Sequence, residues 1–279
     1  MTQTLFQPIG EPAEVVLVHG ISHRVCGSWR SAMQTGLARA GFGPAGGVGA
    51  RCVVYCDLTM PGEPVRPLHP ATDIAVVPEE SVPRRMPRPV LRTLGLVGRW
   101  STFLTDLLVF GIGQRFITRD LVQVRHYFTE PGVREAAHAR LAEAVTPDTA
   151  VLVGFSFGSV IAYEALCRHP EWPVRTLLTV GSPLGIGKLV FTRLDPEPIG
   201  GVGRWPGSVE RWVNVSDDRD VVCLASRLSE RFGPRVEDRM VHNGLQPHDL
   251  NHYLATPEAG RAIAAGLEHR AAPALAVGA

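Results

Sequence analysis

The sequence predicts one α/β domain, in which a mostly parallel sheet carries helices on both faces. Short apolar runs typical of buried strands alternate with segments of helical periodicity along most of the chain. A chain of 279 residues can bury one substantial core, and α/β folds of this size commonly form a single domain. We therefore expect the ligand crevice beyond the carboxyl ends of the parallel strands.

Three elements open the pattern: a strand at Glu14–His19, a helix from about Ser28 to Ala40, and a strand at Arg51–Leu58. Within the second strand, Cys52 and Cys56 fall on the same face and are expected to pack as small apolar residues. The extended chain between them holds the two sulfurs too far apart to share an ion, so no metal site is predicted there.

Residues 59–130 interrupt the alternation and are interpreted as a lid over the crevice. Their first half is rich in proline and arginine, which predicts an irregular loop, whereas Val90–Phe128 is apolar with helical spacing. Arg99, Asp106 and Arg115 break the apolar run, so no membrane-spanning helix is expected. The alternatives for residues 90–128 are a dimer face or a helix on a membrane surface. A lid would imply a hydrophobic acyl substrate. A further apolar wall is expected at Ile186, Leu189, Val190 and Phe191.

The remaining elements follow in the second half of the chain. They are a helix at Val133–Val145, a strand at Val151–Val153, a helix at 159–168, a strand at Arg175–Gly181, a loop at 183–208, a strand at Val209–Val215, a helix at 221–232, a strand at Val236–His242 and a final helix at Leu250–Leu267. The last residues, Ala271–Ala279, are expected to fray.

The most informative motif is Gly154-x-Ser156-x-Gly158, which follows an apolar strand and precedes a helical pattern. This is the shape of a nucleophile elbow, a sharp strand-to-helix turn that exposes a serine hydroxyl above a sheet. Side chains at positions 154 and 158 would collide with neighbouring backbone in so tight a turn, which explains the glycines. The alternative is an ordinary junction between a strand and a helix, and it depends on whether Ser156 has partners.

Two stretches that follow strands offer those partners. A serine hydroxyl is a poor nucleophile until a base accepts its proton, and an acid must orient that base. One stretch contains Asp217, Asp218 and Asp220, and the stretch after the last strand contains His242, His248 and His252. The resulting chain order of serine, acid and histidine is the order expected for this type of elbow.

These residues together resemble the α/β-hydrolase superfamily, and most closely its bacterial serine esterase and lipase-like members. The resemblance covers nearly all of residues 12–265 apart from 59–130. Beside the elbow it includes Val180-Gly181-Ser182-Pro183-Leu184-Gly185, Trp212-x-Asn214-x-x-Asp217-x-x-Asp220-x-Val222, and His248-Asp249 upstream of Tyr253-Leu254. Phe155 stands where many relatives carry His, and Phe157 where many carry Leu; neither position supplies catalytic atoms. Because the chain begins at what would be the third strand, the first antiparallel strands of the full fold are expected to be missing.

The resemblance helps to choose the acid and the base. It implies Asp220 as the acid, with Asp217 as the alternative and Asp218 facing solvent. It implies His248 as the base. His252 is expected to cap or line the cleft, and His242 to end its strand and pack.

The same resemblance implies an oxyanion hole made of two backbone N–H groups. One belongs to Phe157, the residue after the serine. The other belongs to Ile21, with Ser22 as the alternative, in the turn His19-Gly20-Ile21-Ser22. Gly20 lets this backbone turn inward, and His19 is expected to brace the turn through hydrogen bonds.

Composition limits the kinds of partner and the cellular compartment that we expect for the protein. The formal net charge of +1 gives no electrostatic case for nucleic acid. The N-terminus lacks a basic start and an apolar run, and five cysteines do not suggest a disulfide framework, so a cytoplasmic location is expected. Gly41-Phe-Gly43-Pro-Ala-Gly46 has dinucleotide-fingerprint spacing, but it follows a helix and precedes a strand. No cofactor is therefore predicted.

The predicted function is a serine hydrolase that cleaves a carboxylic ester or thioester of a hydrophobic acyl group through an acyl-enzyme. The same residues would serve an acyltransferase or macrocyclase, or a serine peptidase. A different class is a non-catalytic binding protein on a hydrolase scaffold, and the ordered serine, acid and histidine argue against it.

Overall fold

The computed structural model describes residues 12–21, 24–43, 48–59, 66–68, 114–223 and 227–271. Its centre is a six-stranded sheet with the order β3-β1-β5-β6-β7-β8, in which every pair of neighbours is parallel. The strands are β1 (Val15–Val18), β3 (Ala50–Val53), β5 (Val151–Phe155), β6 (Thr176–Val180), β7 (Arg211–Asp217) and β8 (Val236–Val241). The α/β class and the parallel sheet predicted from the sequence are therefore confirmed.

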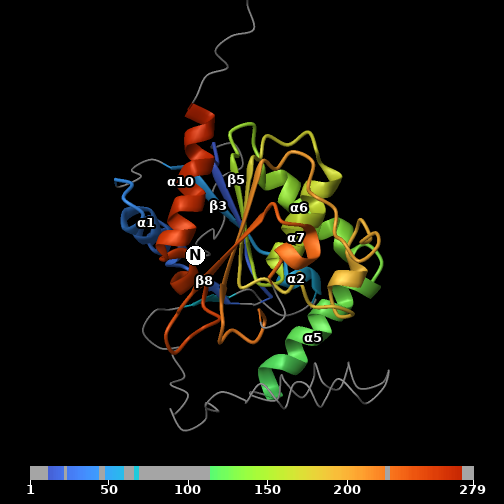
Figure 1. Ribbon diagram of the computed structural model, residues 1–279. Coiled ribbons are helices and arrows are strands. Elements are labelled where there is room, and N and C mark those ends of the chain that lie inside the picture. The colour runs from blue at the N-terminus through green and yellow to red at the C-terminus, as the bar shows by residue number, and fades with distance from the viewer. Residues whose placement is uncertain are drawn as a thin grey trace, which may run out of the picture.

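Helices cover both faces of this sheet (Figure 1). One face carries α1 (Trp29–Arg39), α9 (Leu250–Leu254) and α10 (Pro257–Ala271), and the other carries α2 (Cys56–Thr59), α5 (Gln114–Thr129), α6 (Val133–Ala144) and α7 (Gly158–Arg168). Every residue of β1, β5 and β6 is buried, because these strands have a helical layer on each side. This double covering explains why they read as continuous apolar runs.

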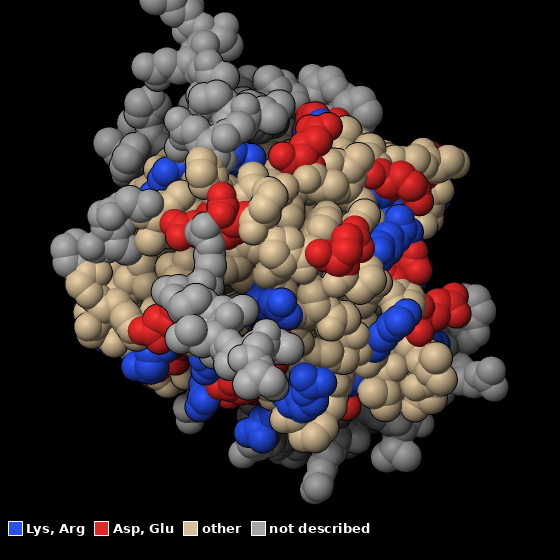
Figure 2. Space-filling model, turned by 90° about the horizontal axis from the view of Figure 1, so that it is seen from above, with Lys and Arg blue, Asp and Glu red and all other residues tan. Residues whose placement is uncertain are grey.

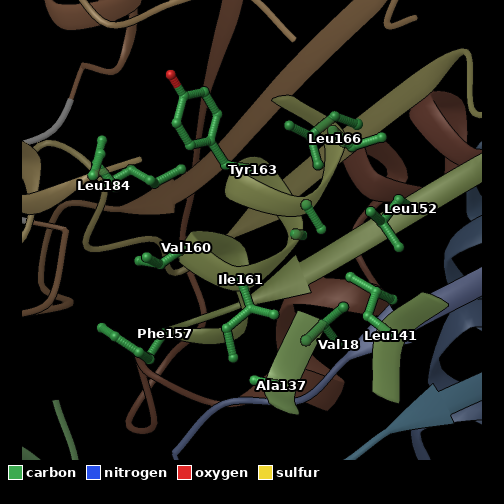
Figure 3. Close-up of a cluster of buried hydrophobic side chains, with 14 of the residues drawn as sticks. Val18, Ala137, Leu141, Leu152, Phe157, Val160, Ile161, Tyr163, Leu166 and Leu184 are labelled. Carbon is green, nitrogen blue, oxygen red and sulfur yellow. The ribbon is translucent and has the colours of Figure 1, made fainter. Parts of the chain in front are cut away.

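Each face has its own hydrophobic core. On the α6 and α7 side, Val18 of β1 and Leu152 of β5 belong to a cluster with Ile161 of α7 and Leu141 of α6 (Figure 3). Phe157, the residue after the elbow serine, belongs to the same cluster. The elbow is therefore anchored in a core rather than carried on a surface loop.

Four short elements complete the described residues. β2 (Arg24–Cys26) and β4 (Arg66–Leu68) form a separate parallel pair, which the sequence did not predict. A 3₁₀ turn, η3 (Phe191–Arg193), lies in the loop predicted at 183–208, and α8 (Ser229–Phe232) precedes β8. Val190 and Phe191 are buried in the core, where Phe191 packs against Phe232, so these two offer no surface as the apolar wall expected of them.

Two predicted elements are wrong in extent. The strand predicted at Arg51–Leu58 ends at Val53, and a helical turn, α2, begins at Cys56. Cys52 and Cys56 therefore do not share a strand face, although Cys56 is buried as expected. The final helix divides into α9 and α10 because Pro257, which lacks a backbone N–H, is tolerated at the first position of a helix but not within one.

The helix predicted at 221–232 is also wrong. Residues 221–223 form a turn, and only Ser229–Phe232 is helical, while residues 224–226 lie outside the described part. The Asp220 side chain accepts a hydrogen bond from the Val222 N–H at 2.9 Å, which is an Asx-turn and competes with a helical start.

Several predictions fall wholly or largely outside the described residues. They concern the missing first strands, most of the lid at 59–130, and the frayed C-terminus. Within 59–130 the structure describes only 59, 66–68 and 114–130, where α5 has the helical form expected for that segment. Among the described helices, none has both the length and the apolar character needed to cross a membrane. On the face seen in Figure 2, basic and acidic side chains are interspersed.

Candidate active site

Ser156 stands at the turn between β5 and α7 and has an unusual backbone conformation. Its φ is +52°, and it is the single non-glycine residue with positive φ in the described part of the chain. Residues other than glycine rarely adopt this conformation, and strain of this kind is frequent at functional sites. Hydrogen bonds from Ser156 N to Val180 O (3.0 Å) and from Ser159 N to Ser156 O (3.0 Å) hold the turn. The hydroxyl is thereby fixed at the carboxyl end of β5.

The two motif glycines are required by close backbone contacts. A Cβ at Gly154 would lie 2.4 Å from Ser159 Cα, and one at Gly158 would lie 2.3 Å from Val18 O. Both separations are far shorter than van der Waals contact, so the predicted steric reason for these glycines is confirmed. Gly20 adds a third close approach, since its Cβ would lie 2.9 Å from Ser156 Cβ.

His248 joins Ser156 to Asp220. Its Nε2 lies 3.0 Å from Ser156 Oγ, and its Nδ1 lies 2.7 Å from Asp220 Oδ2. The His248 side chain is 32% exposed, whereas that of Asp220 is fully buried. Because a carboxylate oxygen only accepts, the Nδ1 atom must carry the proton, which leaves the Nε2 lone pair facing the serine hydroxyl. The structure thus brings together the three residues that the sequence singled out.

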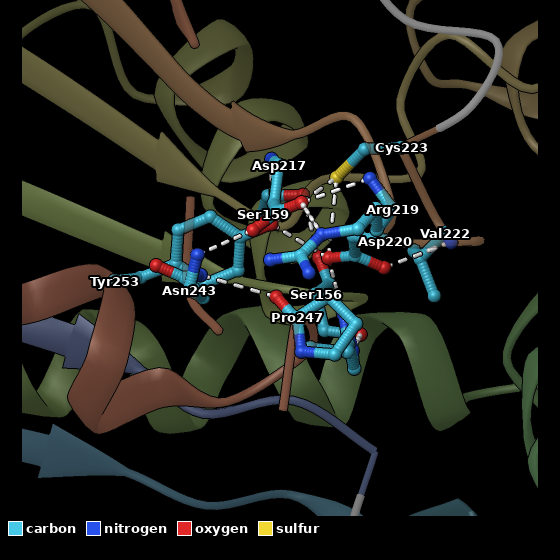
Figure 4. Close-up of polar contacts among 11 residues, drawn as sticks. Ser156, Ser159, Asp217, Arg219, Asp220, Val222, Cys223, Asn243, Pro247 and Tyr253 are labelled. Atoms are coloured by element: carbon cyan, nitrogen blue, oxygen red, sulfur yellow. Dashed lines mark hydrogen bonds and ion pairs between the residues drawn. The ribbon is translucent and has the colours of Figure 1, made fainter. Parts of the chain in front are cut away.

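The Asp220 carboxylate is surrounded by donors (Figure 4). Oδ2 accepts from the Tyr253 hydroxyl at 2.7 Å and lies 3.4 Å from Cys223 Sγ, and Oδ1 accepts from Val222 N. Burial would raise the pKa of Asp220, but hydrogen bonding and charge from His248, with the bonds from Tyr253 and Val222, outweigh it and lower the pKa below its ordinary value. Asp220 is therefore held as an anion.

Asp217, the alternative acid, serves a different contact. It ends β7, and its carboxylate accepts from the backbone N–H groups of Arg219 (2.8 Å) and Asn243. Figure 4 shows Asp217 between these two residues. Asp217 therefore ties the loop that carries His248 to the end of β7, and His248 Nδ1 is bonded to Asp220 instead.

The other predicted histidines do not contact Ser156 or Asp220 through a described hydrogen bond. His242 is exposed and pairs with Asp218 at 3.5 Å, so it does not pack as expected. His252 lies on α9, and its backbone N–H donates to the Asp249 cap at 2.9 Å. His19 is buried with Nδ1 3.2 Å from Gly20 O, and burial lowers the pKa of His19 despite that bond, which suits bracing of the turn.

Phe155 packs against the His248 ring. The two rings are stacked, with centroids 5.0 Å apart and an interplanar angle of 28°. Phe155 also meets His19 edge to face at 6.0 Å, so it links the two turns that flank Ser156. Sequence reasoning expected Phe155 to supply no catalytic atoms and to influence specificity, and it did not predict the stacking on His248, since a stacking partner leaves no spacing signal.

The two predicted oxyanion donors lie in the turns that meet at Ser156. Neither the Phe157 nor the Ile21 N–H donates to an acceptor within the described residues. The Phe157 side chain is buried against Tyr127 and Phe128 of α5, with ring centroids 5.1 and 5.7 Å away. Ile21 is partly buried against the same core cluster, while Ser22, the alternative donor, lies outside the described residues.

Sequence reasoning missed two supports of the site. Tyr253, noted only as part of a motif, donates to Asp220. Ser159 and Ser182, whose hydroxyls lie 2.7 Å apart, connect the elbow to the loop after β6, and Ser159 Oγ also donates to Ser156 O at 2.6 Å. The adjacency of Ser159 to the elbow motif was the available signal, but nothing in the spacing pairs it with Ser182.

Among the described residues, Asp217, Asp218 and His242 form a group whose ligand atoms lie within 4.8 Å of one another. Their oxygens and nitrogen are of a kind that bind cations. The buried Asp217 carboxylate, however, already accepts two backbone N–H groups. These two hydrogen bonds explain the position of Asp217 without a bound cation.

Comparison with known proteins gives little to set beside this geometry. No family model matches the chain, and no curated protein matches it. Among solved structures, the chain is similar to the esterase domain of a protein from Rhodothermus marinus, with 11% sequence identity and a TM-score of 0.36 over 93% of this chain and 84% of that chain. The functional assignment therefore depends on the site itself.

Proposed function

We propose that this protein is a serine hydrolase that cleaves a carboxylic ester or thioester of a hydrophobic acyl group through an acyl-enzyme on Ser156. The observation that carries the proposal is one imidazole hydrogen-bonded on both sides. His248 meets the Ser156 hydroxyl with Nε2 and the buried Asp220 carboxylate with Nδ1. A base next to a strained serine, itself oriented by an acid, is the arrangement that nucleophilic catalysis requires.

In the first step, Ser156 Oγ attacks the carbonyl carbon while His248 Nε2 accepts its proton. Asp220 stabilises the imidazolium that results, because its charge lies 2.7 Å from Nδ1 and is buried away from water. The imidazolium then gives its proton to the leaving oxygen or sulfur. A water molecule, deprotonated by the same imidazole, attacks the acyl-enzyme and releases the acid.

The charge on the carbonyl oxygen needs donors in both half-reactions. We assign the N–H groups of Phe157 and Ile21 to this role. Phe157 follows the nucleophile at the head of α7, and Ile21 follows Gly20, which approaches Ser156 closely. Losing one such donor typically lowers kcat by about 10²–10³.

We infer that the chain has the α/β-hydrolase fold. What supports this is the placing of the three groups on a parallel sheet: the serine follows β5, the acid follows β7 and the histidine follows β8. All three therefore come from the carboxyl ends of strands, where such folds bind their ligands.

The hydrophobic acyl group is proposed from the apolar side chains that pack with Phe157, the residue after the nucleophile. Ile21, Phe128 and Leu189 are partly buried and pack against the same apolar cluster as Phe157, so they leave some apolar surface exposed. These groups suit an apolar chain beside the carbonyl better than an anionic one.

A fluorophosphonate probe tests the proposal. The wild type should be labelled covalently, Ser156→Ala should not, and Ser31→Ala, which removes an exposed hydroxyl on α1, should keep its labelling. Equal labelling of the wild type and Ser156→Ala would overturn the nucleophile assignment. A series of p-nitrophenyl esters tests the substrate class, since kcat/KM should rise from acetyl to longer acyl chains.

A further inference from the structure

The Tyr253 hydroxyl is a second side-chain donor to the Asp220 carboxylate, beside His248. It is 2.7 Å from Asp220 Oδ2, the same oxygen that accepts from His248 Nδ1. It also lies 3.0 Å from the backbone nitrogen of Asp217. Tyr253 belongs to α9, whereas both aspartates come from the end of β7 and the turn that follows it.

The direction of each hydrogen bond follows from the chemistry of the donors. A backbone N–H only donates, so the Tyr253 oxygen accepts from Asp217 N and must use its single proton elsewhere. Burial, reinforced by Cys223 and Asp220, raises the pKa of Tyr253, so the phenol keeps that proton. The phenol proton is therefore directed at Asp220 Oδ2.

We propose that Tyr253 is a positioning residue for the hydrolysis proposed above: its hydroxyl fixes the rotation of the Asp220 carboxylate so that Oδ2 stays aligned with His248 Nδ1. This inference rests on the proposed function for its kinetic consequence. The carboxylate is held at its other oxygen by Val222 N, so Tyr253 and Val222 together leave it one orientation.

The Tyr253 hydroxyl and the His248 imidazole both donate a hydrogen bond to Oδ2, so each weakens the effect of its negative charge on the other. Among the described residues, the titratable groups that contact Asp220 are His248, Tyr253 and Cys223. Asp217 does not bond Asp220 through its side chain and is paired with Arg219 at 3.6 Å. In Tyr253→Phe, Asp220 Oδ2 loses one of its hydrogen-bond donors, and its negative charge acts more fully on the imidazole. The positive form of the imidazole is then favoured more strongly, so general-base catalysis begins at a higher pH.

A tyrosine-to-phenylalanine substitution removes the hydroxyl and little else. Tyr163→Phe is the matched control. Tyr163 lies on α7 and is fully buried like Tyr253, but its hydroxyl donates to Arg204 O at 2.8 Å instead of to Asp220. We would measure the rate of fluorophosphonate labelling across pH for the wild type, Tyr253→Phe and Tyr163→Phe. The low-field proton resonance of the imidazole Nδ1–H, recorded for the same three proteins, reports the Asp220–His248 bond without any reaction.

For Tyr253→Phe we expect a labelling rate about tenfold lower at neutral pH, an acidic limb moved to higher pH, and a displaced Nδ1–H resonance. Tyr163→Phe should match the wild type in all three. A Tyr253→Phe protein with wild-type rate, limb and resonance would overturn the positioning role, and so would identical changes in Tyr163→Phe. If the wild type itself is not labelled at Ser156, the proposed function fails, and the resonance still decides whether Tyr253 holds Asp220.

Discussion

Two buried carboxylates of this protein, Asp220 and Glu164, contact the same types of side chain but differ in exposure and in nearby charge. Both side chains are fully buried, and each accepts a hydrogen bond from a tyrosine hydroxyl, at 2.7 Å from Tyr253 and at 2.6 Å from Tyr127. Each also has a histidine beside it, His248 for Asp220 and His138 for Glu164. Composition alone would not separate the two clusters.

The difference lies in the histidines and in the charge. His248 is 32% exposed, and its second nitrogen meets the Ser156 hydroxyl. The His138 side chain is 5% exposed, and its Nδ1 has no hydrogen-bond partner among the described residues. Glu164 is further contacted by the Arg134 guanidinium at 3.4 Å, whereas within the described part of the chain the ion-pair partner of Asp220 is His248.

The Asp220 cluster therefore suits the proposed proton transfer, whereas the Glu164 cluster suits the joining of helices. The Glu164 cluster joins α5, α6 and α7, and its Oε1 also accepts from Asp195 N at 3.0 Å, so every contact is internal to the fold. The Asp220 cluster has one open end at His248. A buried tyrosine, carboxylate and histidine therefore form a candidate catalytic site only when the histidine contacts a nucleophile and is partly exposed to solvent.

The largest effect that would test this contrast is expected from Asp220→Asn. An amide can donate to His248 Nδ1 and so favour the wrong imidazole tautomer, and such a change lowers kcat by about 10⁴. Asp217→Asn should lower kcat by less than about tenfold, because its contacts hold a loop rather than the imidazole. Steady-state ester hydrolysis measures both. Equal losses in the two variants would reject the choice of acid.

Glu164→Gln should act on stability instead. It leaves the Arg134 guanidinium without its buried counter-charge, which we expect to lower the free energy of unfolding by about 3 kcal/mol. Denaturation in urea measures this, and kcat per fluorophosphonate-reactive site should stay within about threefold of wild type. A large loss of kcat with unchanged stability would show that the second cluster takes part in the reaction.

The site cluster should also leave a signature in the pH dependence of stability. The pKa of Asp220 is lowered in the folded protein, so below its ordinary value of 3.8 the unfolded chain takes up the proton first. The stabilisation by this carboxylate is therefore fully present above that pH and is lost as the pH falls through the folded value. The gap in unfolding free energy between wild type and Asp220→Asn should shrink once the pH falls below 3.8. A gap that widened in acid would contradict the direction of the shift.

How much of this was predictable differs between the two clusters. Ser156, Asp220 and His248 each follow a strand, and parallel strands bring their carboxyl ends to one edge, so sequence order sufficed to group the stretches that carry them. The family resemblance then chose Asp220 and His248 within those stretches. The partners of Glu164 come from α5, α6 and a loop, at separations that no motif records. Such a cluster is defined by packing alone.

The errors in the elements have local causes of the same kind. The apolar residues after Asp220 suggested a helix, but the Asp220 side chain bonds to Val222 N and sets a turn. Tyr253 was read as a motif residue because its function depends on where α9 places the hydroxyl. Contacts across elements, rather than periodicity, decide both points.

The smallest effect is expected from Phe155→Leu, which sharpens the comparison at the open end of the Asp220 cluster. Leucine keeps the position apolar but removes the ring stacked on His248 at 5.0 Å. An aromatic pair contributes about 0.5–1.5 kcal/mol, so kcat should fall about threefold, while the free energy of unfolding falls modestly. Phe191→Leu is the control, since Phe191 is also buried and packs on Phe232 in the core. Both variants should lose stability, and only Phe155→Leu should lose kcat per labelled site. If the two lose kcat equally, the stacked ring contributes packing alone, and the orientation of His248 is set by its two hydrogen bonds.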